Sequence, residues 1–101
     1  MHALSSRVTV ITGANGEIPR AIAALFAQAG ARLLLTDIDV EPLAAFAETL
    51  DGADVAVCRQ DVTDPAAAER VADVARERFG GVDCVITGAG LYQHLDVRSM
   101  T

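Results

Sequence analysis

Two features of the sequence have the residue types and spacing to bind a phosphate and a ribose. A glycine-rich turn at residues 13–16 follows the apolar run at residues 7–12 and precedes a helical pattern. Backbone N–H groups at such a turn face outward, and the helix dipole favours an anion there. Asp37 closes the next apolar run. A carboxylate in that place can accept hydrogen bonds from both hydroxyls of a ribose.

Together, within one β-α-β unit, these features predict a dinucleotide site that prefers NAD. The carboxylate of Asp37 would repel the 2′-phosphate of NADP, which makes NADP the less favoured cofactor. Arg32 and Arg59 oppose this preference, because either cation could offset the negative charge.

The elements that must position this site follow from the apolar pattern. Strands are expected at residues 7–12, 31–36, 54–59 and 82–87, and helices at residues 18–29, 40–50 and 64–79. Strands this apolar suit a parallel sheet that is buried on both faces. The predicted fold is therefore α/β, a Rossmann-like three-layer α/β/α arrangement in a single domain spanning residues 1–101.

Three details of the helices are expected. In the first helix one face is predicted to be buried, because four apolar residues recur at helical spacing: Ile18, Ile22, Leu25 and Phe26. Gly30 is expected to end this helix. Asp64 is expected to be the N-cap of the third helix, with Pro65 in its first turn.

Composition excludes several function classes. The net charge is −6, with charges of both signs interleaved and no lysine among the eight basic residues. The chain lacks the basic patch that nucleic acid or an anionic membrane surface requires. No apolar stretch is long enough for a signal peptide or a membrane span. No Cys/His spacing indicates a metal site. We expect a cytoplasmic protein in which Cys58 and Cys84 are reduced core residues.

Four segments resemble the motifs of the short-chain dehydrogenase/reductase family. The segment TGANGEIP at residues 12–19 is similar to the fingerprint T-G-x-x-x-G-I-G. Asp61 and Val62 resemble the Asp-Val pair of that family. The segments at residues 79–83 and 84–90 resemble the fourth-strand region that ends in Asn-Asn-Ala-Gly. These motifs extend over essentially the whole chain.

The resemblance implies a strand order of 3-2-1-4, with the cofactor across the carboxyl ends of the strands. The loop after the first strand would hold the pyrophosphate, and Asp37 and Ile38 would hold the adenosine. Asp61 would contact the adenine amino group. The implied cofactor-binding residues are Gly13, Asn15, Gly16, Ile18, Asp37, Ile38, Asp61, Val62, Thr87, Ala89 and Gly90.

Three departures from the motifs bear on function. Glu17 and Pro19 stand where the fingerprint has glycines, and Thr87-Gly88 replaces Asn-Asn. Glu17 adds a negative charge beside the pyrophosphate, and Pro19 removes one N–H donor. These changes predict weakened NAD binding, although Arg20 could partly neutralise Glu17.

The family's catalytic Ser, Asn and Tyr-x-x-x-Lys are not matched in this chain. Its tyrosine is Tyr92, Asp96 follows in the lysine position, and lysine is absent from the sequence. The resemblance therefore implies the NAD(H)-binding part of an oxidoreductase that transfers hydride between nicotinamide and an alcohol or carbonyl. The alternative is a non-catalytic remnant that binds adenine nucleotide weakly or acts through protein association.

The last residues, 96–101, resemble the approach to the family's next helix, which indicates a truncated domain. The fourth strand would then have an open edge. Because open edges pair with other chains, a homo-oligomer through this edge is expected.

Overall fold

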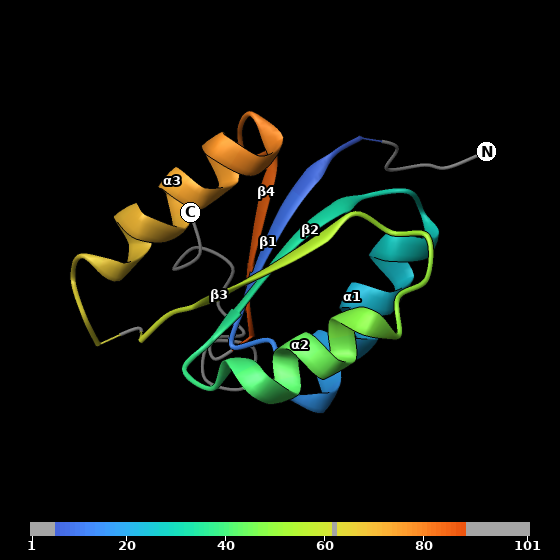
Figure 1. The fold of residues 1–101 in the computed structure, drawn as a ribbon, viewed down its shortest axis with the longest axis horizontal. Coiled ribbons are helices and arrows are strands. Elements are labelled where there is room, and N and C mark those ends of the chain that lie inside the picture. Colours follow the sequence, from blue (N-terminus) through green and yellow to red (C-terminus); the bar gives the residue numbers. More distant parts are fainter. Residues whose placement is uncertain (1–5, 62, 89–101) are drawn as a thin grey trace, which may run out of the picture.

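The structure, a computed structural model, describes residues 6–61 and 63–88. Strands and helices alternate along them, as Figure 1 shows. The elements are β1 (Val8–Thr12), α1 (Glu17–Gln28), β2 (Arg32–Asp37), α2 (Val40–Glu48), β3 (Val55–Arg59), α3 (Ala67–Phe79) and β4 (Cys84–Thr87).

The strands form one parallel sheet in the order β3-β2-β1-β4, which confirms the predicted order. In the register, Thr12 lies opposite both Thr36 of β2 and Thr87 of β4. Helices α1 and α2 cover one face of the sheet and α3 covers the other (Figure 1). The predicted three-layer arrangement is thus confirmed, and all the carboxyl strand ends meet at one edge.

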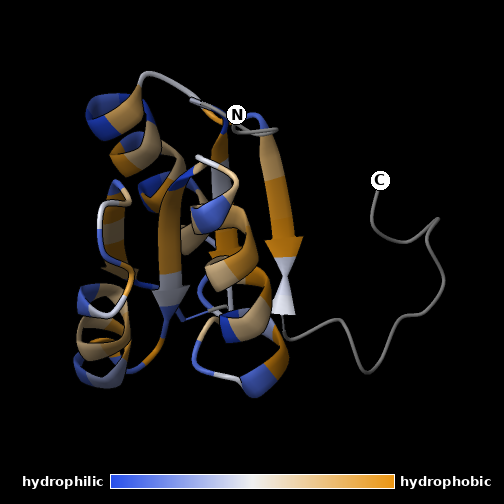
Figure 2. Ribbon diagram, turned by 90° about the vertical axis from the view of Figure 1, so that its right-hand side faces the viewer, coloured by the Kyte–Doolittle hydropathy of each residue, from blue (hydrophilic) through white to orange (hydrophobic). Residues whose placement is uncertain are grey.

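The core lies on both sides of β2, whose successive side chains point to opposite faces. Leu33 and Leu35 pack with Leu43 under α1 and α2, whereas Leu34 packs with Val71 under α3. All three leucines of β2 are fully buried. Figure 2 shows the hydrophobic strands enclosed between the helices. A sheet buried on both faces holds its strand ends, and the loops that follow them, in fixed positions.

The buried face of α1 differs from the predicted one. Pro19 and Ala23 face the sheet, with Ile22 and Phe26 partly buried beside them. Ile22 and Phe26 agree with the expectation. Ile18 and Leu25 do not, since 45% and 64% of their surface is exposed. The small side chain of Ala23 lets the helix approach the strands, and this turns the larger leucine outward.

Helix α3 begins later than predicted. Its N-cap is Ala66, not Asp64. The Asp64 carboxylate accepts the amide of Ala66 at 3.0 Å, and its carbonyl accepts the amide of Ala67 at 3.0 Å. These bonds form a turn that precedes the helix.

The carboxyl end of α1 agrees with the prediction. Gly30 follows the helix with φ +91°, which confirms its role in ending α1.

The two cysteines lie on opposite edge strands and are free, as expected. Cys84 is exposed, so its assignment to the core was wrong. The cause is the position of β4, which pairs only with β1 among the described residues. The cytoplasmic location inferred partly from these cysteines stays a prediction. Within residues 6–61 and 63–88, no helix is long and apolar enough to span a bilayer.

Candidate nucleotide-binding site

The loop between β1 and α1 is built to expose backbone amides. Gly13 has φ +61°, a conformation that favours glycine, and it turns the chain away from β1. The amide of Ala14 then donates to the carbonyl of Thr36 at 3.0 Å, which ties the loop to β2. Gly16 is the N-cap of α1 and supplies no side-chain cap. Within the described residues, the amides of Glu17 and Ile18 have no acceptor. They are open donors at the positive end of a helix dipole.

Asp37 joins this loop to the end of β2. Its Oδ2 accepts the amide of Asn15 at 2.9 Å, and its Oδ1 accepts the amide of Ile38 at 2.7 Å. An ionised carboxylate offers about four acceptor positions, so further hydrogen bonds to Asp37 are available. The carboxylate of Asp37 therefore helps to shape the loop between β1 and α1 and presents a hydrogen-bond acceptor beside it.

The side chain of Asn15 extends the connection to the next loop. Its Nδ2 donates to the carbonyl of Asp39 at 2.9 Å, and its Oδ1 accepts from Arg20 at 3.5 Å. The guanidinium of Arg20 lies 5.2 Å from the centre of the Phe46 ring, in cation–π geometry. The loops after β1 and β2 are thus linked through side chains of α1 and α2.

Arg20 does not pair with Glu17, contrary to the expectation. Across residues 6–61 and 63–88, Glu17 makes no salt bridge and is exposed. Phe46 provides the reason, because its ring and Asn15 together hold the guanidinium on the α2 side of the helix. The negative charge of Glu17 is left uncompensated beside the open amides.

Asp61 follows β3 and is held by Thr63. The hydroxyl of Thr63 donates to Oδ1 of Asp61 at 2.6 Å, and its amide donates to the same oxygen at 2.9 Å. The hydroxyl bond, followed by the amide bond, holds the pKa of the Asp61 carboxyl below its ordinary value of 3.8. Thr63 was not singled out from the sequence. The pattern Asp-x-Thr, typical of an Asx turn, is the signal that could have identified it.

A second contact that the sequence did not reveal joins β2 and β3. The hydroxyl of Thr36 donates to Oε1 of Gln60 at 2.6 Å, and the amide of Gln60 donates to the carbonyl of Asp37 at 2.9 Å. Thr36 is fully buried, so this bond satisfies a polar group inside the protein. Its effect is to bring the segment that carries Asp61 close to the end of β2.

Of the remaining predicted residues, three are described by the structure and three are not. Ile18, in the first turn of α1, and Ile38, directly after β2, are half exposed, at 45% and 53%. Thr87 ends β4 opposite Thr12. Three of the predicted residues lie outside the described ones: Val62, Ala89 and Gly90.

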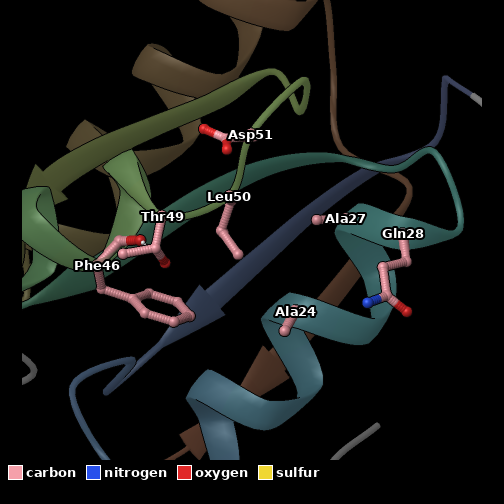
Figure 3. A pocket seen from close by; sticks show the side chains of 7 residues that line it. All are labelled: Ala24, Ala27, Gln28, Phe46, Thr49, Leu50 and Asp51. Atoms are coloured by element: carbon pink, nitrogen blue, oxygen red, sulfur yellow. Dashed lines mark hydrogen bonds between the residues drawn. The ribbon is translucent and has the colours of Figure 1, made fainter.

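A separate hollow of about 400 Å³ lies between α1 and the end of α2. In Figure 3, Phe46 and Leu50 point into the space beside Ala24 and Ala27 of α1. This hollow includes none of the predicted site residues and lies toward the amino ends of the strands. The residues predicted to bind the cofactor and described by the structure lie instead at or after the carboxyl ends of the strands.

Comparison with known families agrees with this arrangement. The family model described as short chain dehydrogenase matches residues 7–101. A 1-deoxy-11-beta-hydroxypentalenate dehydrogenase of Streptomyces avermitilis is 45% identical over 93 residues, which are 90% of this chain and 34% of that protein. An uncharacterized oxidoreductase of Mycobacterium bovis is 37% identical over 99 residues, covering 97% of this chain and 40% of that protein. The chain thus spans about a third of the length of such relatives.

Solved structures give the same result. A short-chain dehydrogenase/reductase of Brucella melitensis superposes with a TM-score of 0.79 at 45% identity, over 83% of this chain and 36% of that one. One from Burkholderia phymatum, in complex with NAD, gives 0.78 at 39% identity, over 84% and 31%. An alcohol dehydrogenase of Thermococcus sibiricus, complexed with 5-hydroxy-NADP, gives 0.74 at 36% identity, over 78% and 35%.

The hydrogen bonds around Asp61 lead to a prediction about pH. The pKa of Asp61 is lower in the fold than its ordinary value, so the interaction stabilises the protein above about pH 4 and is lost as the pH falls through the folded pKa. Thr63→Val removes the hydroxyl donor and should raise the pKa of Asp61 toward 3.8, as measured by carboxyl ¹³C NMR. Thr49→Val is the control, since that hydroxyl donates to the Phe46 carbonyl instead. An unchanged Asp61 pKa in Thr63→Val would contradict the assignment.

Proposed function

This chain belongs to the short-chain dehydrogenase family, and from that premise we propose that it is the NAD(H)-binding part of an oxidoreductase. The observation that carries the proposal is the position of Asp37. Its carboxylate lies at the end of β2 and is bonded to the loop that exposes the amides of Glu17 and Ile18. An acceptor for ribose hydroxyls beside donors for a pyrophosphate matches the chemistry of an adenine dinucleotide.

The described residues fit the cofactor on three counts. The amides of Glu17 and Ile18 would donate to the pyrophosphate, and the unused acceptor positions of Asp37 would take the ribose hydroxyls. Asp61, ionised at neutral pH, would accept from the adenine amino group. When bound, the nicotinamide would supply the hydride acceptor or donor.

A preference for NAD over NADP rests on this chain's own charges, because solved relatives include complexes with cofactors of both kinds. Repulsion between the Asp37 carboxylate and one negative charge of a 2′-phosphate about 4 Å away would cost roughly 4 kcal/mol of binding free energy at an effective dielectric constant of 20, before screening by salt. Arg20 is held against Phe46 and Asn15 and does not neutralise Asp37. Arg32 is held elsewhere, because its guanidinium donates to the Ser6 carbonyl and lies over the Phe79 ring. Arg59 lies opposite Asp37 in the register of β2 and β3, so this cation would reduce the repulsion of a 2′-phosphate by Asp37.

Glu17 opposes binding of any dinucleotide. A carboxylate in the first turn of a helix is favourable for the helix itself, because it interacts with the positive end of the dipole. The Glu17 carboxylate therefore competes with the pyrophosphate for the positive end of the α1 dipole. Its charge has no partner among the described residues, so repulsion of the pyrophosphate is moderated only by solvent. We expect weakened binding as a result.

This chain matches only about a third of the length of its dehydrogenase relatives. We therefore propose the hydride transfer for a full-length protein of this family and not for the residues of this chain alone. The sequence contains no lysine and therefore no Tyr-x-x-x-Lys motif. Glu17 and Pro19 favour the second candidate, a non-catalytic protein that binds adenine nucleotide weakly. Titration of the wild-type chain with NAD separates the two candidates, because only the first requires measurable binding of NAD itself.

We also propose that a second copy of this chain pairs with the edge of β4. Among the described residues this strand has a neighbour on one side only. Val82, just before this strand, is 41% exposed, and Val85, within it, is 55% exposed. An apolar edge with unpaired backbone groups is a site of strand pairing between chains.

Asp37→Asn should change the choice of cofactor. The amide keeps an oxygen acceptor but loses the charge, so the ratio of NADP affinity to NAD affinity should rise by about tenfold or more in calorimetric titration. Asp51→Asn, an exposed carboxylate at the other end of the sheet, is the matched control and should leave the ratio unchanged. Equal ratios in wild type and Asp37→Asn would refute the role of this carboxylate.

Glu17→Gly should increase affinity for NAD and ADP-ribose by about fivefold at low salt, and less at high salt. The reason is removal of an unpaired charge from the open amides. Glu48→Gly controls for the loss of one negative charge elsewhere. If the two variants bind equally well, Glu17 does not act on the phosphate site.

Pairing at the β4 edge should appear in light scattering as a mass that rises with concentration above the 10.5 kDa of one chain. Val85→Lys adds charge at an exposed position and should shift the equilibrium toward the monomer. A mass that stays at 10.5 kDa at high concentration would exclude the pairing.

A further inference from the structure

Pro19 is among the most deeply buried residues of the chain, although it stands in the first turn of α1. Less than 2% of its surface is exposed. The position is permissive for proline, because an N–H in the first turn has no partner within the helix. Burial is not required by that argument. The burial of the Pro19 ring is therefore explained by the groups that the ring contacts.

The end of β4 contacts the Pro19 ring with no room for a side chain. A Cβ atom added at Gly88 would lie 2.7 Å from Cγ of Pro19, and 2.6 and 2.9 Å from the carbonyl oxygens of Thr12 and Gly13. Such distances are essentially never seen for real Cβ atoms. Residue 88 is thus restricted to glycine by the ring on one side and the loop backbone on the other.

The same ring limits the N-cap. A Cβ atom at Gly16 would lie 3.2 Å from Cδ and 3.5 Å from Cγ of Pro19. The φ and ψ of Gly16, −69° and 160°, are open to any residue, so the ring and not the backbone conformation makes this site tight. The Pro19 ring therefore restricts two glycines, Gly16 at the start of α1 and Gly88 after β4.

Two of the departures from the family motifs meet at this point. Pro19 stands where the fingerprint has its last glycine, and Gly88 stands where the fourth-strand motif has its second asparagine. The positions are far apart in sequence but in contact in space. A larger residue on α1 is matched by the loss of a side chain on β4.

We propose that Pro19 and Gly88 are a complementary pair that sets the spacing between the first turn of α1 and the end of β4. Pro19 is a positioning residue and binds no ligand. Its ring has a fixed φ and few conformers, so it acts as a rigid spacer behind the loop at residues 12–16. Without the ring, the end of β4 would have room to move away from the carbonyl oxygens of Thr12 and Gly13, which also exclude a side chain at residue 88. Only the binding readout below rests on the proposed dinucleotide site.

A double-mutant cycle on stability tests the pair. Gly88→Ala should raise the unfolding equilibrium constant by about tenfold or more, which corresponds to about 1.4 kcal/mol. In the Pro19→Gly background a measurable part of this increase should disappear, because the contact with the ring is gone and the end of β4 can move into the space left by it. Urea unfolding of the four proteins measures the coupling. Additive effects of the two substitutions would overturn the proposal.

A second cycle keeps the test decisive where Gly88→Ala does not fold. Gly16→Ala introduces a milder contact, in which the Pro19 ring is the only group closer than 3.4 Å. Its destabilisation should vanish with Pro19→Gly. Gly52→Ala is the control, since that glycine has φ +78° and nothing within 4 Å of an added Cβ. Gly52→Ala should destabilise the fold by backbone strain and show no coupling to Pro19→Gly.

Binding of ADP-ribose separates positioning from stability alone. Gly88→Ala should weaken binding at temperatures where the variant is folded, and the double variant should recover it. If wild type binds no ADP-ribose but the stability cycle shows coupling, the pair stands and the dinucleotide proposal fails. If ADP-ribose binds but the cycle is additive, the pair fails and the site stands.

Discussion

The carboxylate of Asp37 is the interaction on which the rest of the site depends. It accepts the amides of Asn15 and Ile38, which belong to the loops after two neighbouring strands. This is possible because β1 and β2 are parallel and in register, so that Thr12 and Thr36 end side by side. The strands are fixed in turn by a core on both faces of the sheet. The sheet thus holds the Asp37 carboxylate at the end of β2, and we propose that its remaining acceptor positions bind the ribose hydroxyls.

The departures at the phosphate loop have different physical consequences. Glu17 acts through charge, over several ångströms and subject to screening. Pro19 acts through volume, at contact distance, and through one missing N–H. The first effect bears on affinity and the second on the geometry of the loop and of β4. The loop keeps Gly16 as N-cap, and the amides of Glu17 and Ile18 have no acceptor among the described residues, although Glu17 and Pro19 stand where the family fingerprint has glycines.

The sequence predicted the elements and the position of Asp37, because each follows from a local apolar pattern or a strand end, whereas the order of the strands was implied by the resemblance to the family. It failed where a tertiary contact decides the outcome. Periodicity placed Leu25 on the buried stripe of α1, but close packing of Ala23 turned it outward. Arg20 was expected near Glu17 as a sequence neighbour, whereas Phe46 of another helix holds it. The contact of Pro19 with Gly88 joins distant segments, and no local pattern indicates it.

The most direct test of the account is an NMR titration of the ¹⁵N-labelled chain with ADP-ribose, which carries the two ribose rings and the pyrophosphate but no nicotinamide. Binding beside Asp37 should produce saturable shifts of the amides of Glu17, Ile18 and Ile38, with Gln28 and Leu50 at the opposite end of the sheet unmoved. Shifts that cluster around Gln28 and Leu50, or no shifts from a folded chain at millimolar ligand, would contradict it.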